Sequence, residues 1–167
     1  PGSLKRNLNI YVLSEDVTGN FEVPNSTIKD NLKEWINQGR MINDTVDILD
    51  AKIINIGIEF EAVSTVESNP FEVLNQAIAS LSVYYDKKFE IGEPFYIGEI
   101  FSHINKMKGI VDVTRVKVTQ KTGLGYSNDV VFNVDDNMSI DDRYIVVPDN
   151  AALEIKYPSQ DIKGSVR

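Results

Sequence analysis

Alternation of apolar and polar residues predicts the main strands of the chain. A nearly continuous apolar run over residues 8–13 (LNIYVL) is typical of a buried strand. Residues 54–62 (INIGIEFEA) alternate strictly, which predicts a strand with its apolar residues inward and with Asn55 and Gly57 among the outward ones. Over residues 110–118 the apolar residues change from odd to even positions, and this one-residue change of face predicts a β-bulge.

Apolar residues three and four positions apart predict three helices. The first follows a run of capping residues at 25–27, with Thr27 and Asp30 at the spacing of a capping box. The second follows the cap Asn69 and begins with a proline, and the third begins at Gly98. The apolar stripes expected to face the core are Ile28, Leu32, Trp35 and Ile36 in the first helix, and Phe71, Leu74, Ile78, Leu81 and Tyr85 in the second.

After residue 119 the pattern changes to short alternating strands, separated by turns rich in Asp, Asn and Gly. These strands are expected at residues 130–134, 144–146 and 153–157. The element order predicts an α+β fold with a β-α-β-α-α-β core, helices packed on one face of a sheet, and a small β-rich C-terminal extension. We expect the α+β domain over residues 4–120 and the extension, or small subdomain, over residues 121–160. Residues 1–3 are interpreted as a cloning remnant, and the chain as a piece of a longer protein.

Composition excludes several classes of function. The net charge is −8 with a pI near 4.7, and the basic clusters are short, which argues against a general nucleic-acid binder. The chain has no cysteine, so disulfide scaffolds, thiol catalysis and cysteine-ligated zinc are excluded. No apolar run approaches the roughly 18 residues that a membrane span needs. We therefore expect neither nucleic acid nor a membrane among the partners.

The segment EIGEPFYIGEIFSHI, residues 90–104, holds the chain's single histidine. Glu99 and His103 are four residues apart and share a face of the predicted helix, so they could supply two metal ligands or an acid–base pair. A metal site needs a third ligand, and a hydrolase needs an oriented nucleophile, yet no serine is evidently placed beside His103. The favoured interpretation is a helix start with Gly98 as N-cap, followed by a solvent-facing pair.

Two acidic groups and a glycine pair are candidate binding sites. Asp44, Asp47 and Asp50 match a calcium loop in number, although their spacing is not that of an EF-hand. Asp135–Asn137 with Asp141–Asp142 could hold a cation, although these residue types are also usual in turns. The Gly123-Leu124-Gly125 segment lacks the strand-to-helix context of a nucleotide-binding loop and is interpreted as a hairpin turn. We therefore expect no catalytic residue, no cofactor and no small-molecule substrate.

Two long segments carry a family resemblance. They are RMINDTVDILDAKIINIGIEFEAV (residues 40–63) and IGEPFYIGEIFSHINKMKGIVDV (residues 91–113). Together with the first strand and the capped helix, the chain from about residue 5 to residue 120 resembles the baseplate J-like family. This family provides wedge components of contractile phage tails and related injection machines. The β-rich segment after residue 120 is less similar to it.

The resemblance implies a structural function without enzymatic activity or a cofactor. Members associate with themselves and with other baseplate wedge proteins, and form the ring around the hub that rearranges when the sheath contracts. The location implied is the tail baseplate of the virion, with the host cytoplasm as the place of assembly. Phe95, Tyr96, Tyr126 and Tyr144 are expected to contribute to subunit contacts, because aromatic residues are enriched in interface cores.

Two other functions were considered beside this one. The first is a calcium-assisted carbohydrate- or peptide-binding module of a phage tail, which would use the acidic turn at residues 135–142. The second is a carboxylate-based hydrolase, for which the sequence offers the weakest support. The expected partners are therefore other copies of the chain and other wedge proteins.

Overall fold

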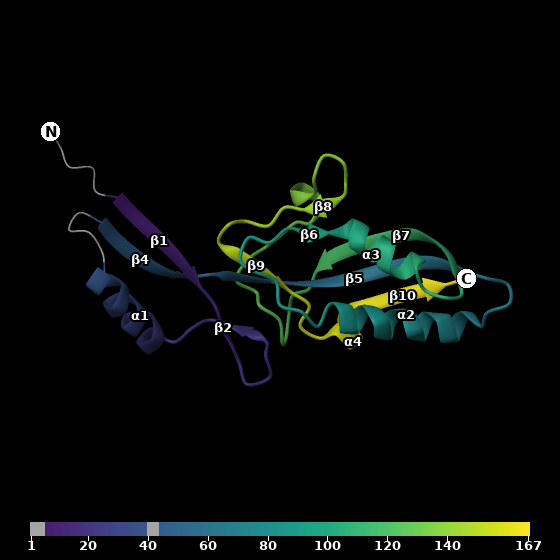
Figure 1. The fold of residues 1–167 in the computed structure, drawn as a ribbon, viewed down its shortest axis with the longest axis horizontal. Helices are drawn as coiled ribbons and strands as arrows, with labels where there is room; N and C mark the ends of the chain where they lie inside the picture. The colour runs from purple at the N-terminus through teal and green to yellow at the C-terminus, as the bar shows by residue number, and fades with distance from the viewer. Residues whose placement is uncertain (1–5, 40–43) are drawn as a thin grey trace. The chain divides into compact units, whose positions relative to one another are not determined.

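The computed structural model of the chain describes residues 6–39 and 44–167, which fold as two compact units (Figure 1). Unit 1 comprises residues 1–52 and unit 2 comprises residues 53–167. Helices and strands occur in both units, which confirms the predicted α+β class. The units divide the chain at a different place from the boundary expected near residue 120, because the last strands return to the sheet of unit 2. None of the helices in the described ranges is long and apolar enough to cross a membrane.

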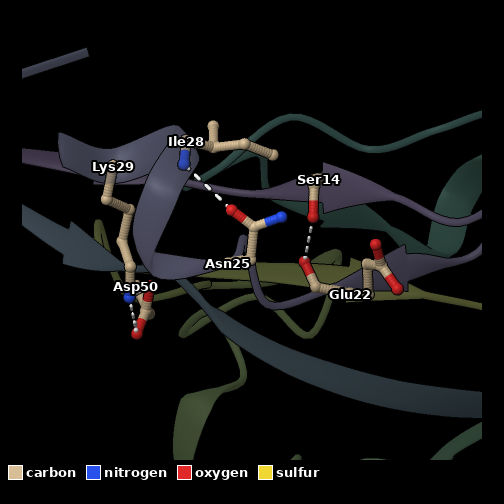
Figure 2. Close-up of polar contacts among 6 residues, drawn as sticks. All are labelled: Ser14, Glu22, Asn25, Ile28, Lys29 and Asp50. Carbon is tan, nitrogen blue, oxygen red and sulfur yellow. Dashed lines mark hydrogen bonds and ion pairs between the residues drawn. The ribbon is translucent and has the colours of Figure 1, made fainter. Parts of the chain in front are cut away.

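Unit 1 is a β-α-β unit with a small hairpin. The strands β1 (Arg6–Val12) and β4 (Asp44–Asp50) pair in parallel. Helix α1 (Ser26–Gly39) joins them and packs mainly against β4 (Figure 1). The short strands β2 (Ser14–Glu15) and β3 (Phe21–Glu22) form an antiparallel hairpin between β1 and α1, and the Ser14 hydroxyl donates a hydrogen bond to the Glu22 carbonyl (Figure 2).

The first turn of α1 is held by two side-chain contacts (Figure 2). The Asn25 Oδ1 atom accepts a hydrogen bond from the Ile28 amide at 2.9 Å, so Asn25 is the cap and not Thr27 as the capping-box spacing predicted. The Lys29 Nζ atom lies 2.9 Å from Asp50 Oδ1. This ion pair ties the start of the helix to the carboxyl end of β4.

The apolar stripe of α1 is only partly covered, contrary to the prediction that it faces a core. Leu32 and Ile36 are half-buried, whereas Ile28 is 50% exposed and Trp35 is 72% exposed. Two strands about 4.8 Å apart are narrower than a helix, whose diameter with side chains is about 10 Å. A two-stranded sheet therefore leaves one flank of the helix in solvent.

Unit 2 is built around one long strand, β5 (Lys52–Ser64). On one side β5 pairs antiparallel with β7 (Ile110–Gln120), and on the other it pairs in parallel with β10 (Ile162–Val166). The strand β9 (Ala151–Glu154) also pairs with β5. Helix α2 (Pro70–Tyr84) packs against β10 and helix α3 (Ile97–Asn105) packs against β7, so both helices lie over the central sheet.

The two faces of β5 differ along its length. Ile54, Ile56, Ile58, Phe60 and Ala62 all point into one hydrophobic core, as the alternation predicted. On the other face Glu59 and Glu61 are exposed, but Asn55 and Gly57 are buried, so the prediction that these two face outward is wrong. Residues from distant parts of the chain cover them, because Glu154 bonds to Asn55 and the Lys121 side chain lies over Gly57.

Helix α2 (Pro70–Tyr84) begins where its capping signal predicted. The Asn69 side chain accepts a hydrogen bond from the Phe71 amide at 3.0 Å, and Pro70 occupies the first turn. The buried face is rotated relative to the predicted stripe, since Phe71 is 77% exposed. The buried residues within the helix are Val73, Ala77 and Leu81.

The remaining helices of unit 2 are shorter. Helix α3 (Ile97–Asn105) has Tyr96 at its N-cap position and not Gly98, and it buries one apolar residue per turn. Helix α4 (Pro158–Asp161) is a single turn before β10, and a 3₁₀ turn, η1 (Asp135–Asn137), lies in the segment before β8. The two-residue strands β6 (Phe95–Tyr96) and β8 (Tyr144–Ile145) pair antiparallel.

Two predictions made for the second half of the chain have opposite outcomes. The bulge in β7 is confirmed, because Glu61 is opposite Arg115 whereas Ala62 is opposite Val113, which leaves Thr114 unpaired in the ladder. The strand expected over residues 130–134 does not form. That segment has no strand partner, and Val134 at its end has helical backbone angles, with φ −62° and ψ −42°. The side chain of Gln120 takes the place of a strand partner, with bonds to the Val130 carbonyl and the Phe132 amide.

Candidate interaction surface

Tyr96 and Tyr144 meet across the β6–β8 pair. They occupy opposite positions in the register, and their ring centroids lie 5.6 Å apart. The other residues of the pair, Phe95 and Ile145, are 1% and 0% exposed. Successive side chains of a strand point to opposite faces, so burial of Phe95 and Ile145 directs both tyrosines outward. We call these two rings, with the adjacent Glu99 and Arg143, the tyrosine surface.

A shallow groove of about 430 Å³ lies beside the Tyr96 ring and is lined by Tyr96, Gly98, Glu99 and Arg143. Gly98 leaves it open, since no atom lies within 4 Å of the position that a Cβ would take. Arg143 is exposed, with Nε 3.3 Å from the Asp141 carboxylate. The groove therefore combines an aromatic wall with one acidic and one basic side chain.

Tyr84, the last residue of α2, and Lys87, which follows the helix, hold Glu99 in this groove. Its Oε2 atom accepts a hydrogen bond from the Tyr84 hydroxyl at 3.0 Å, and the Lys87 ammonium lies 3.9 Å away. Burial, and then the hydrogen bond to Glu99, raise the pKa of Tyr84 above its ordinary value. The same ammonium lies 5.4 Å from the centre of the Tyr84 ring, which adds a cation–π contact.

Phe95 is part of the core and not of the surface. Its ring packs against Tyr85 and Phe89, with centroid distances of 5.5 and 5.7 Å. A side chain that is 1% exposed cannot contact another protein without unfolding of its surroundings. Substitution of Phe95 would therefore report on folding and not on association.

Tyr126 is half-buried and is held inside unit 2. Its hydroxyl donates a hydrogen bond to Asp161 Oδ1 at 2.6 Å, and its ring meets that of Tyr157 edge to face at 5.6 Å. The hydrogen bond to the Asp161 carboxylate, together with burial, raises the pKa of Tyr126 to about 12. Since the phenol must stay protonated to donate, Tyr126 anchors the loop that follows β7.

Glu99 and His103 do not pair with each other, although they share α3. The His103 Nε2 atom lies 2.8 Å from the Ser80 hydroxyl of α2, a serine partner that the sequence did not indicate. An acyl-transfer site needs free amide donors next to its nucleophile. Ser80 lies in the middle of a helix, where amides are already used by the helix itself, and Glu99 bonds to Tyr84. The geometry is that of a cross-link between α2 and α3.

The acidic turn uses its side chains to close on itself. Asn133 bonds to Asp136 at 2.7 Å and accepts from the Asp135 amide, which shapes η1. Asp141 accepts from the Ser139 hydroxyl at 2.7 Å, and this bond lowers the pKa of Asp141. Across residues 6–39 and 44–167 no three acidic or histidine side chains gather in a way that could hold a metal ion.

The aspartates of β4 also fail to converge. Asp47 accepts a hydrogen bond from Asn7 at 3.0 Å, whereas Asp50 pairs with Lys29. These two residues are an odd number of positions apart, so they point to opposite faces of the strand. The side chain of Asp44 lies outside the described residues.

The Gly123-Leu124-Gly125 segment is a turn, but not the expected hairpin. Gly123 and Gly125 have φ angles of 111° and 91°, and the Asn128 side chain bonds to both the amide and the carbonyl of Gly123. The chain then continues into the segment held by Gln120, without a second strand.

The sequence patterns did not indicate Arg143, nor Tyr84 and Lys87 as the partners of Glu99. Arg143 could have been found because it is adjacent to Tyr144 and therefore shares any surface that this residue joins. Tyr84 and Lys87 carry no such signal, since only the packing of α2 brings them to Glu99. A scan of protein-family models and a search of curated proteins found no match to this chain.

Proposed function

We propose that this chain is a non-enzymatic structural component of a contractile-tail baseplate wedge, and that it associates with other copies through the tyrosine surface. The resemblance over about residues 5–120 supports the baseplate role. In this role the protein joins other wedge proteins in the ring around the hub, is assembled in the host cytoplasm and resides in the virion. No cofactor or small-molecule substrate is required.

The pairing of Tyr96 with Tyr144 is the observation that carries the choice of surface. Tyrosine and arginine are the residue types that most often dominate binding energy, above all where they surround a pocket. Tyr96 is 48% exposed, and its ring forms one wall of the groove. These features are typical of a surface that binds another protein.

The charges of the groove favour a second copy as that partner. Glu99 and Arg143 line the same groove with opposite charges. In a two-fold interface, every contact between two different residues occurs twice. Arg143 of each copy can therefore approach Glu99 of the other copy. Pairing of opposite charges contributes orientation and association rate more than affinity.

Light scattering coupled to size-exclusion chromatography tests the surface. We expect the wild-type mass to rise with concentration and the rise to be smaller for the Tyr96→Ala/Tyr144→Ala variant, because association through the tyrosine surface should be at least tenfold weaker. Phe71→Ala is the matched control, because Phe71 is another exposed aromatic residue of unit 2 and lies outside the groove. An unchanged mass for a folded double variant would reject the tyrosine surface as an interface.

A charge exchange tests the two-fold arrangement. Glu99→Arg alone and Arg143→Glu alone should each weaken association, and the two changes together should restore it. Lack of restoration would argue against the two-fold contact. The baseplate role has a separate test, which is co-purification with wedge proteins encoded beside its gene.

A further inference from the structure

Unit 1 has the architecture of an unfinished sheet. Parallel strands are normally buried on both faces, and a two-stranded sheet is marginal in water. Here the described part of the unit offers only β1 and β4 as a parallel pair, with one helix on one face. Leu8 of β1 is 56% exposed, although its register partner Val46 of β4 is 6% exposed. The apolar face is therefore covered over β4 and open over β1.

The backbone of β1 has a defined free edge. The Ala51 amide donates to the Val12 carbonyl at 2.9 Å, and Val12 is opposite Asp50 in the register. In a parallel ladder this bond means that Val12, and every second residue before it, bonds to β4. The amides and carbonyls of the intervening residues, Asn7, Asn9 and Tyr11, point away from β4. In the described ranges β4 is the single strand partner of β1.

The β1 edge lacks the features that keep sheet edges apart. Exposed edges are usually protected by charged residues, prolines or bulges. Arg6 is the single charged residue of β1 and stands at its start, residues 7–13 (NLNIYVL) contain neither a charge nor a proline, and β1 pairs with β4 without a register shift. By contrast, β4 carries Asp44, Asp47 and Asp50, so two β4 edges would bring like charges together.

We propose that the β1 edge is a strand-addition surface for a second copy of this chain, with β1 antiparallel to its counterpart. The product is a four-stranded sheet in the order β4–β1–β1–β4. Adjacent strands are about 4.8 Å apart, so two helices that each lie over a β4 strand would be about 14 Å apart, on either side of the two β1 strands.

The arrangement accounts for the exposure of Leu8. The two Leu8 side chains would lie in the centre of the new sheet, between the two helices and on the same face as they are. This inference rests on unit 1 alone and is independent of the proposed function, which concerns unit 2.

A proline at Asn9 tests the edge selectively. Asn9→Pro removes an amide that points to the free edge and leaves the β1–β4 bonds in place, since proline is tolerated where the N–H faces solvent. Asn9→Thr is the matched control, because it keeps the amide and favours a strand. Both are made in full-length chain that carries Tyr96→Ala/Tyr144→Ala, which removes the other proposed interface.

In this background we expect Asn9→Thr to form a concentration-dependent dimer and Asn9→Pro to remain monomeric, with at least a tenfold weaker association. Equal masses for the two variants at every concentration would overturn the proposal, whether both are dimers or both are monomers. The tyrosine surface is tested by comparing wild type with Tyr96→Ala/Tyr144→Ala, and the β1 edge by comparing Asn9→Thr with Asn9→Pro. Failure of one proposal therefore does not decide the other.

Amide hydrogen exchange is a second test that does not need the proline variant, so it remains available if Asn9→Pro unfolds unit 1. In chain with an intact β1, the amides of Asn7, Asn9 and Tyr11 should be protected at high concentration. They should exchange at least tenfold faster at low concentration, whereas the amide of Ile10, which bonds to β4, should change less. Rapid exchange of the three edge amides at all concentrations would reject strand addition.

Discussion

Gly164 shows how a single residue position depends on a neighbour in the sheet. It lies in β10 directly opposite Phe60 of β5, and the Phe60 ring fills the space beside it. A Cβ at Gly164 would overlap the Phe60 ring carbons. Phe60 is 2% exposed and surrounded by core, so its ring has little room to move. The absence of a side chain at Gly164 is therefore a packing requirement.

We expect Gly164→Ala to lower the free energy of unfolding by about 1–3 kcal/mol, the usual cost of overpacking. Phe60→Leu should reduce this cost when combined with it, since the smaller side chain clears the overlap. Urea denaturation of the two single variants and the double variant measures the coupling. Gly98→Ala is the control, because no atom lies within 4 Å of its Cβ position. A coupling energy near zero would contradict the packing explanation.

At the scale of elements, Gln120 replaces a strand with a side chain. It is the last residue of β7, its Nε2 atom donates to the Val130 carbonyl at 2.6 Å, and its Oε1 atom accepts from the Phe132 amide at 2.7 Å. One amide side chain thus satisfies a backbone donor and a backbone acceptor of residues 130–132. Phe132 and Val134 are buried and Val131 and Asn133 are exposed, as in a strand, although no ladder forms.

Gln120→Ala should lower the free energy of unfolding by about 1–3 kcal/mol, from two hydrogen bonds of roughly 0.5–1.5 kcal/mol each. Loss of the hydrogen bond from Phe132 to Gln120 should appear as faster hydrogen exchange of the Phe132 amide, which NMR can measure for each residue. Gln120→Glu keeps the acceptor for Phe132 and loses the donor to Val130, so its effect on this amide should be smaller. Equal exchange in all three proteins would show that Gln120 does not hold the segment.

Sequence patterns predicted the structural features that depend on neighbouring residues. The α2 cap at Asn69 and the bulge near Thr114 were both found, since each depends on a few neighbouring residues. Burial of Asn55 was not, because its partner Glu154 is 99 positions away. The segment after Val130 alternates like a strand, and nothing local tells that its partner is a side chain.

In the candidate surface too, the sequence predicted what depends on neighbouring residues and not what depends on distant ones. Tyr96 and Tyr144 were selected as aromatic residues, but the sequence did not indicate that they meet, since pairing of two-residue strands leaves almost no pattern. Phe95 was selected with Tyr96 although adjacent residues of a strand face opposite ways. With the short strand recognised, alternation would have assigned Phe95 to the core.

At the scale of the molecule, the two units differ in how much they bury. Helix α1 has no buried residue, whereas α2 buries three and joins a core that includes residues of every large element of unit 2. Burial of apolar area is the main stabilising contribution to folding. Unit 1 should therefore be the less stable unit when it is not associated.

Hydrogen exchange measured by mass spectrometry checks this difference. At low protein concentration, peptides from α1 should exchange at lower urea concentration than peptides from α2, because local opening follows local stability. Raising the protein concentration should slow the α1 peptides selectively if β1 pairs with another copy. Simultaneous exchange in both units would mean that they unfold as one cooperative unit.

The pairing of β10 with β5 also orders events during synthesis of the chain. Ile162 lies opposite Ile58, so one side of β5 stays without β10 until nearly all of unit 2 has left the ribosome. Unit 1 is different, because β4 has paired with β1 once the chain reaches Asp50. Contacts between residues distant in sequence form slowly, and strands that have not yet paired with their partner strands promote aggregation. Nascent chains that end between β7 and β10 should therefore depend most on chaperones.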